Sequence, residues 1–202
     1  MDRYFFWSLL TNLIFIFAMI GYLFMDTIDY LHSNIIQISL TNQIYIFLAA
    51  IFVVNASLQF LVLYHTNKTT LRYSTMILSA TIDLIGSYAY LYAAFLATYA
   101  SKNTNMIWLS NGFGVCAFVI AALINLMIPG FSPLLLWADY LNLIGANLYL
   151  LAFVITHVRL AQVVIIIGDF IYLIDAILYT IYWFQERTWW RLMNEEQYIL
   201  LK

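Results

Sequence analysis

The sequence predicts an all-α, polytopic integral membrane protein whose six transmembrane helices derive from a degenerate single-helix repeat of about 30 residues. The first reason is composition: of the 202 residues, 65% are hydrophobic and 9% are charged, and the mean hydropathy is +0.89. These values exclude an ordinary water-soluble domain. The formal net charge of −2 gives no basic excess, so nucleic acid is not an expected partner.

The second reason is the length of the apolar stretches. A helix needs about 20 apolar residues to cross roughly 30 Å of hydrocarbon. Six stretches meet this requirement, at 5–25, 43–64, 76–99, 106–128, 133–156 and 161–184. Lipid offers the backbone no hydrogen-bond partner, and continuous apolar runs are not typical of barrel strands, so each stretch is expected to be helical. Residues 1–184 form the predicted transmembrane domain.

Each stretch is bounded by a change in composition. The first follows Arg3 and is too long for the apolar region of a cleavable signal peptide. The second begins after the longest linker, 26–42, and the third begins after the polar segment 65–69. Segment 101–105 precedes the fourth stretch, and two prolines in 129–133 mark the turn before the fifth. These connections are short, so we expect no soluble domain between the helices.

Positive charges favour one side of the predicted bundle. If the helices alternate in direction, six Lys and Arg residues lie on the side shared by both termini, and two lie opposite. The six are Arg3, Lys68, Arg72, Arg187, Arg191 and Lys202, and the two are Lys102 and Arg159. Because positive loops stay on the inner side of a membrane, both termini are predicted on the cytoplasmic or matrix side.

The C-terminal segment 185–202 mixes aromatic, aliphatic and charged residues. Trp189, Trp190 and Arg191 lie in this segment, and Trp183 lies just before it. The mixture is consistent with an amphipathic helix at the membrane surface, and equally with a segment that docks onto a partner protein. We predict these four residues as the docking surface of the tail.

A short pattern recurs in the apolar stretches. A polar residue is followed after three positions by a small residue and after four more by an aromatic residue. The three clear copies are Asp83-Gly86-Tyr90, Asn142-Gly145-Tyr149 and Asn111-Gly114-Phe118, while the copy around Gly21 is degenerate and Asp175 replaces the glycine in the last stretch. Residues four apart share a helix face, so the gap left by each small residue lies beside an aromatic side chain of the same helix. We interpret Gly21, Gly86, Gly114 and Gly145 as helix-packing residues.

The glycine, small residue and aromatic pattern in hairpin pairs resembles the YrhK-like family of small two-helix membrane repeats. The residues that carry this resemblance are Gly86-Ser87 with Tyr90 and Gly145-Ala146 with Tyr149. The resemblance implies membrane helices and no established chemistry, so it adds no functional residues.

Four aspartates are the sharpest anomaly of the sequence. Asp83, Asp139, Asp169 and Asp175 fall in stretches that contain no Lys, Arg or His. A charge at the centre of a bilayer costs about 2.5–3.5 kcal/mol on insertion scales, so such residues face the bundle interior and often mark ion pathways. Protonated carboxyls that hydrogen-bond to Asn, Ser or Tyr are the expected resting state.

These carboxyls admit two interpretations, in which Asn55, Asn142 and Asn147 take part. In one, the polar cluster is a relay for protons or small cations, as in transporters. In the other, neutral Asp and Asn side chains form interhelical hydrogen bonds worth about 0.6 kcal/mol each, which fix the helix register or hold partner helices.

Enzymatic and cofactor interpretations find less support. Gly168-Asp169 matches half of an intramembrane aspartyl protease motif, but the preceding glycine and the partner motif are missing. The three histidines, His32, His65 and His157, fall near opposite surfaces, so neither a metal nor haem is expected. The single cysteine, Cys116, lies in an apolar run and is expected to be a free, buried thiol. We therefore predict no enzyme activity and no cofactor.

The leading hypothesis from sequence is an accessory membrane subunit that packs against lipids and other membrane subunits of a large complex. An organellar respiratory assembly in the mitochondrial inner membrane is one such complex, suggested by a composition rich in Ile, Phe, Tyr and Asn. No soluble substrate is expected in this case. The alternative hypothesis is a small proton-coupled transporter or cation channel that uses the intramembrane carboxylates.

Overall fold

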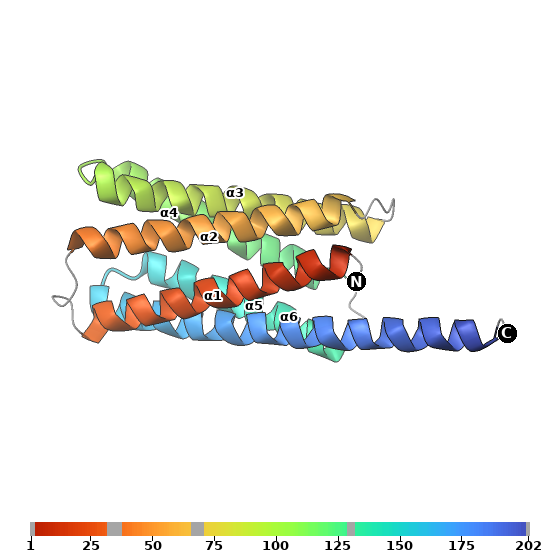
Figure 1. The fold of residues 1–202 in the computed structure, drawn as a ribbon. Coiled ribbons are helices and arrows are strands. Elements are labelled where there is room, and N and C mark those ends of the chain that lie inside the picture. The colour runs from red at the N-terminus through yellow and green to blue at the C-terminus, as the bar shows by residue number, and fades with distance from the viewer. Residues whose placement is uncertain (1–2, 32–37, 66–70, 129–131, 201–202) are drawn as a thin grey trace.

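The structure is a computed structural model that describes residues 3–31, 38–65, 71–128 and 132–200. Its side chains are described over 6–31, 40–64, 74–128 and 132–186. Within these residues all regular structure is helical (Figure 1). The helices are α1 (Arg3–Leu31), α2 (Ile38–His65), α3 (Leu71–Tyr99), α4 (Thr104–Leu126), α5 (Pro133–Val154) and α6 (Val158–Leu200).

Six segments of these helices are long and apolar enough to cross a membrane, which confirms the predicted number of such helices. They are Phe6–Leu31, Leu40–Tyr64, Ser74–Tyr99, Thr104–Leu126, Pro133–Val154 and Val158–Glu186. Among the segments long enough to cross a membrane, the largest difference from the predicted ranges is at the end of the first, which continues past residue 25 to Leu31. Asp26 therefore belongs to α1 and not to a linker, and its carboxyl accepts a 2.5 Å hydrogen bond from the hydroxyl of Tyr45 in α2.

Local signals in the sequence define several helix ends. Ser132 caps α5 by accepting a 3.3 Å hydrogen bond from the amide of Leu134, and Pro133 occupies the first turn, where its missing N–H is not needed. At the start of α6, Nδ1 of His157 accepts a 3.3 Å hydrogen bond from the amide of Leu160. His157 thus caps a helix, which gives it a structural role.

The helices form a closed ring. Each helix packs against the one before it and the one after it in the chain, and α6 closes the ring against α1. Because the helices alternate in direction, α1, α3 and α5 begin at the same end, which we call the N-terminal end of the bundle. α6 also ends there, and its last turns project beyond the other helices (Figure 1).

Small residues and aromatic rings lock neighbouring helices together. A Cβ atom added to Gly145 of α5 would lie 3.1 Å from the ring of Tyr172 in α6, and one added to Gly168 of α6 would lie 3.1 Å from the ring of Tyr149 in α5. Each aromatic ring therefore fills the space beside the glycine of the neighbouring helix.

The same exchange joins α3 and α4. A Cβ atom at Gly86 would lie 3.1 Å from the ring of Phe118, and one at Gly114 would lie 3.2 Å from the backbone nitrogen of Tyr90. Between α1 and α2, a Cβ atom at Gly21 would lie 2.5 Å from Leu48. All four glycines that were singled out from the sequence lie at helix contacts.

The outer surface of the ring is apolar. Large hydrophobic side chains are exposed on every helix, including Phe24, Phe47, Tyr92, Phe113, Leu151 and Phe170. Cys116 is also exposed, so the prediction of a buried thiol is wrong. Its position on an apolar run could not distinguish the two faces of a helix that is apolar almost all round.

Candidate functional site

A cavity of about 340 Å³ occupies the axis of the ring and is lined by all six helices. It reaches the N-terminal end of the bundle, where Ser8 of α1 and Leu135 of α5 lie in its wall. At roughly 30 Å³ per water molecule, this volume has room for on the order of ten waters. The cavity is therefore a vestibule and not a packing defect.

An aromatic layer closes the inner end of this cavity. Each helix contributes one ring, and the six residues are Tyr22, Phe52, Tyr90, Phe118, Tyr149 and Tyr172. Ring centroids lie 5.5 Å apart between Tyr22 and Phe52, and 5.7 Å apart between Tyr149 and Tyr172. Phe15 joins the two groups, because its ring lies 5.6 Å from Phe52 and 6.2 Å from Tyr172.

Polar residues face the cavity at fixed distances from the aromatic layer. In helices that begin at the N-terminal end, they precede the aromatic residue, and in the others they follow it. Asp83 and Asn142 lie seven positions before their aromatic residues, while Gln59, Asn125 and Tyr179 lie seven positions after theirs. Seven residues are two helical turns, or about 10 Å, so these five side chains form one polar layer across the axis.

Asp175 and Asn55 lie closer to the aromatic layer. Both follow their aromatic residue by three positions, and both face the cavity. Asp175 is 0% exposed, and neither of its carboxylate oxygens has a hydrogen-bond partner. Oδ1 of Asn55, which is 3% exposed, also has no partner. The wall at the deep end of the cavity therefore holds three acceptor oxygens without a partner, together with the buried hydroxyl of Tyr22, which also has none.

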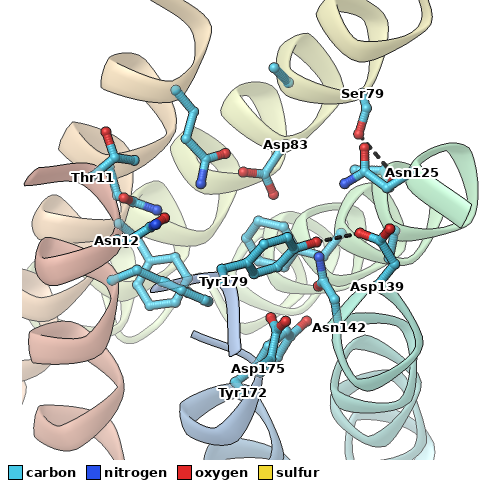
Figure 2. Close-up of a pocket in the computed structure, with 18 of the residues that line it drawn as sticks. Thr11, Asn12, Ser79, Asp83, Asn125, Asp139, Asn142, Tyr172, Asp175 and Tyr179 are labelled. Carbon is cyan, nitrogen blue, oxygen red and sulfur yellow. Dashed lines mark hydrogen bonds between the residues drawn. The ribbon is translucent and has the colours of Figure 1, made fainter. Parts of the chain in front are cut away.

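Asp83 and Asp139 complete the group of carboxyls. The Asp83 side chain points into the cavity opposite Tyr179, whose hydroxyl donates a hydrogen bond to Asp139 (Figure 2). Asp139 and Asp175 are close enough to interact electrostatically. No Lys, Arg or His occurs among the described residues that line the cavity. Three carboxyls thus share one space without a fixed countercharge.

Asp169 lies on the other side of the aromatic layer. It is 0% exposed, it precedes Tyr172 by three positions, and it accepts a hydrogen bond from the hydroxyl of Tyr149. Its carboxyl interacts with that of Asp26 in α1. The structure therefore separates Asp169 from the other three predicted carboxyls and pairs it with an aspartate that the sequence analysis had placed in a linker.

A second cavity of about 380 Å³ lies toward the opposite end. Its wall includes Asn111 and Trp108 of α4 and Ile165 of α6. Tyr90 and Tyr149 line both cavities. Two side chains of the aromatic layer therefore stand between the vestibule and the second cavity.

Other predicted site residues lie outside this site. Asn147 is exposed on the outer surface, where its amide donates a 2.8 Å hydrogen bond to the backbone oxygen of Leu143. Trp183 is 3% exposed, so it packs within the bundle and is not part of an accessible tail surface. The backbone of α6 is helical to Leu200, but the side chains of Trp189, Trp190 and Arg191 lie outside the described residues.

Several residues of the site were missed from the sequence. They are Asp26, Tyr45, Gln59, Asn125 and Tyr179, together with Asn12. One signal points to three of them, Gln59, Asn125 and Tyr179: the polar position changes from before the aromatic residue to after it in every second helix. A pattern that is read in one chain direction only does not include these three residues.

Within the part of the chain that the structure describes, no group of three His, Cys, Asp or Glu residues could hold a metal ion. Comparison with known proteins adds no relative: no family model, no curated protein and no solved structure matches this chain. The YrhK-like resemblance stays a prediction.

Proposed function

We propose that this protein is a small, proton-linked membrane transporter whose path runs along the axis of the helix ring. The observation that carries the proposal is the vestibule, in which Asp83, Asp139 and Asp175 share a space whose described lining contains no Lys, Arg or His. A scaffold has no need of such a space, since membrane helices associate through close van der Waals packing. Carboxyls in a hydrated cavity are instead typical of ion and proton pathways.

The aromatic layer fits a gate in this proposal. It separates two cavities that extend toward opposite ends of the bundle, and Tyr90 and Tyr149 belong to both walls. The hydroxyl of Tyr149 also donates to Asp169 on the far side. A proton could cross the layer along this hydroxyl without a continuous water column, whereas a larger solute would require the rings to move.

Orientation follows from the distribution of positive charges. With both termini inside, the vestibule faces the cytoplasm or matrix, and cargo enters or leaves from that side. The structure would then be an inward-facing state of an alternating-access cycle.

Charge movement in reconstituted membranes tests the proposal. Proteoliposomes adsorbed to a solid-supported membrane are exposed to a proton jump and then to a Na⁺ or K⁺ jump, and the displaced charge is recorded. We expect a transient with the wild-type protein and at least a tenfold smaller one with Asp175→Asn, because that variant removes the deepest titratable group. Asn147→Ala, which changes an exposed residue, serves as the matched control. Folded wild-type protein that moves no charge under any of these conditions would contradict the proposal.

A second candidate is the accessory subunit expected from sequence. The observation that favours it is the length of α6, whose final turns project past the ends of the other helices (Figure 1). Gentle detergent extraction, native-size separation and mass spectrometry test this candidate. Stable co-migration with other membrane subunits supports it, and a monodisperse monomer or homo-oligomer contradicts it.

A further inference from the structure

We propose that the vestibule binds an organic ammonium ion, with the charged nitrogen at Asp175 and an apolar body against the rings of the aromatic layer. This inference rests on the proposed transport function and goes beyond it by naming the chemical class of the cargo.

The unsatisfied atoms at the bottom of the cavity define one end of the ligand. Both carboxylate oxygens of Asp175 and Oδ1 of Asn55 are buried acceptors without a partner. A ligand that satisfies them must carry several hydrogen-bond donors. A protonated primary amine offers three N–H donors for these oxygens and a positive charge for the carboxylate, beside which the described cavity lining has no Lys, Arg or His.

The walls define the other end of the ligand. Tyr22, Phe52, Phe118 and Tyr172 present aromatic rings next to Asp175 and Asn55. Aromatic faces attract cations through their quadrupole and also bury apolar groups. Carboxyls that combine with several aromatic rings are a typical arrangement for ammonium recognition.

The available ligand groups argue against a bare inorganic cation. Ca²⁺ and Mg²⁺ need several oxygen ligands that converge at about 2.0–2.6 Å. Among the described residues, no group of three acidic, His or Cys side chains could hold a metal ion. The cavity volume of about 340 Å³ falls in the range of small-molecule sites, which begins at about 300 Å³.

The test compares two ligands that differ only in the charged group. 2-Phenylethylammonium and 2-phenylethanol have similar shapes, but only the first carries a positive charge and three N–H donors. Binding to the purified, folded protein in detergent is measured by the shift of the thermal unfolding midpoint and by titration calorimetry. We expect the ammonium ion to bind at least tenfold more tightly than the alcohol, since hydrogen bonds to charged groups are the stronger ones.

Two substitutions assign the site. Asp175→Asn is expected to reduce the affinity for the ammonium ion at least tenfold and to leave the weak binding of the alcohol unchanged. Asp83→Asn, one polar layer away, is expected to cause a smaller loss, and Asn147→Ala no loss. Because the Asp175 side chain has no protein partner to lose, the Asp175→Asn variant is expected to fold.

The outcomes separate this inference from the proposed function. Equal binding of both ligands, or binding of neither to wild-type protein that shows charge movement with protons, overturns the ammonium site and leaves the transport proposal standing. Ammonium binding that depends on Asp175, in a protein that moves no charge, supports the site and overturns transport.

Discussion

The carboxyls at the two ends of the ring differ in their hydrogen bonding. At the opposite end, each interior aspartate is matched to a tyrosine: Tyr45 donates to Asp26, and Tyr149 donates to Asp169. At the N-terminal end, Tyr179 donates to Asp139, whereas both oxygens of Asp175 have no partner. The presence of an aspartate in an apolar helix therefore does not mark a functional site by itself. Oδ2 of Asp169 also has no partner, so the features that distinguish Asp175 are that both of its oxygens lack a partner and that it adjoins the vestibule.

The aromatic layer separates the two ends of the ring. Disrupting its packing is therefore expected to have the largest effect on the stability of the protein. In Gly168→Leu, the new side chain meets the ring of Tyr149, which already lies 3.1 Å from a Cβ atom at this position. Overpacking of this kind costs about 1–3 kcal/mol or more, and we expect a loss of monodisperse protein in size-exclusion chromatography. Ala97→Leu, on the exposed face of α3, is the control. A fully stable Gly168→Leu protein would show that the layer is loosely packed.

Opening the layer should join the two ends. Tyr90→Ala removes one of the two side chains that line both cavities. A cysteine introduced as Gln59→Cys in a Cys116→Ser background reports access to the vestibule, since Gln59 is half-buried and lies in its wall. In sealed vesicles we expect a charged thiol reagent to label this cysteine from the N-terminal side only, and from both sides after Tyr90→Ala. Labelling from both sides before the substitution would mean that the layer is no barrier.

The carboxyls of the two ends should respond in opposite ways to truncation. Asp169→Ala leaves the buried hydroxyl of Tyr149 without its acceptor and is expected to lower the free energy of unfolding by about 1–3 kcal/mol. Asp175→Ala removes a buried carboxyl that has no hydrogen-bond partner, so stability should stay the same or rise, because a buried polar group without a partner carries a desolvation cost, while charge movement and ammonium binding are lost. Equilibrium unfolding in mixed micelles measures the first effect. Equal destabilisation by both substitutions would remove the contrast between the ends.

Removing one tyrosine hydroxyl at each end should give a smaller difference in stability between the two ends. Tyr45→Phe removes the donor to Asp26 and is expected to cost about 1 kcal/mol. Tyr179→Phe removes the donor to Asp139, which faces the cavity, and water can replace the lost hydroxyl there. Its cost should therefore be nearer 0.5 kcal/mol. Thermal unfolding of both variants under identical detergent conditions compares the two, and a larger loss for Tyr179→Phe would argue that the vestibule is dry.

The number of helices could be predicted from the sequence because it depends on the length of apolar runs alone. The end of α1 could not, since it depends on the Asp26 to Tyr45 contact between two helices. A hydropathy profile treats a carboxyl as the end of an apolar run, whereas a hydrogen-bond partner on the neighbouring helix allows the helix to continue. The same limitation explains why Cys116 was placed inside: an almost uniformly apolar helix does not indicate which face is inward.

The site could be predicted in part. Asp83, Asp139, Asp175, Asn55 and Asn142 were expected in one polar cluster, and the structure brings all five to the vestibule. Asp169 and Asn147 could not be separated from them, because that separation depends on which side of the aromatic layer, or which face of the helix, each side chain takes. Those assignments require the order of the helices in the ring, and helix order is not encoded in local periodicity.

The most direct test of the central claim is the charge selectivity of the vestibule. In a Cys116→Ser background, the Gln59→Cys protein, whose cysteine replaces a half-buried residue of the vestibule wall, is reacted with a cationic and with an anionic methanethiosulfonate reagent of similar size, and the two rates are compared. Carboxyls without countercharge concentrate cations in a low-dielectric cleft, so we predict that the cationic reagent reacts at least tenfold faster and that Asp83→Asn with Asp175→Asn reduces this preference. A cysteine that neither reagent reaches until the protein is denatured, or that both reach at equal rates, would contradict a hydrated, cation-selective vestibule.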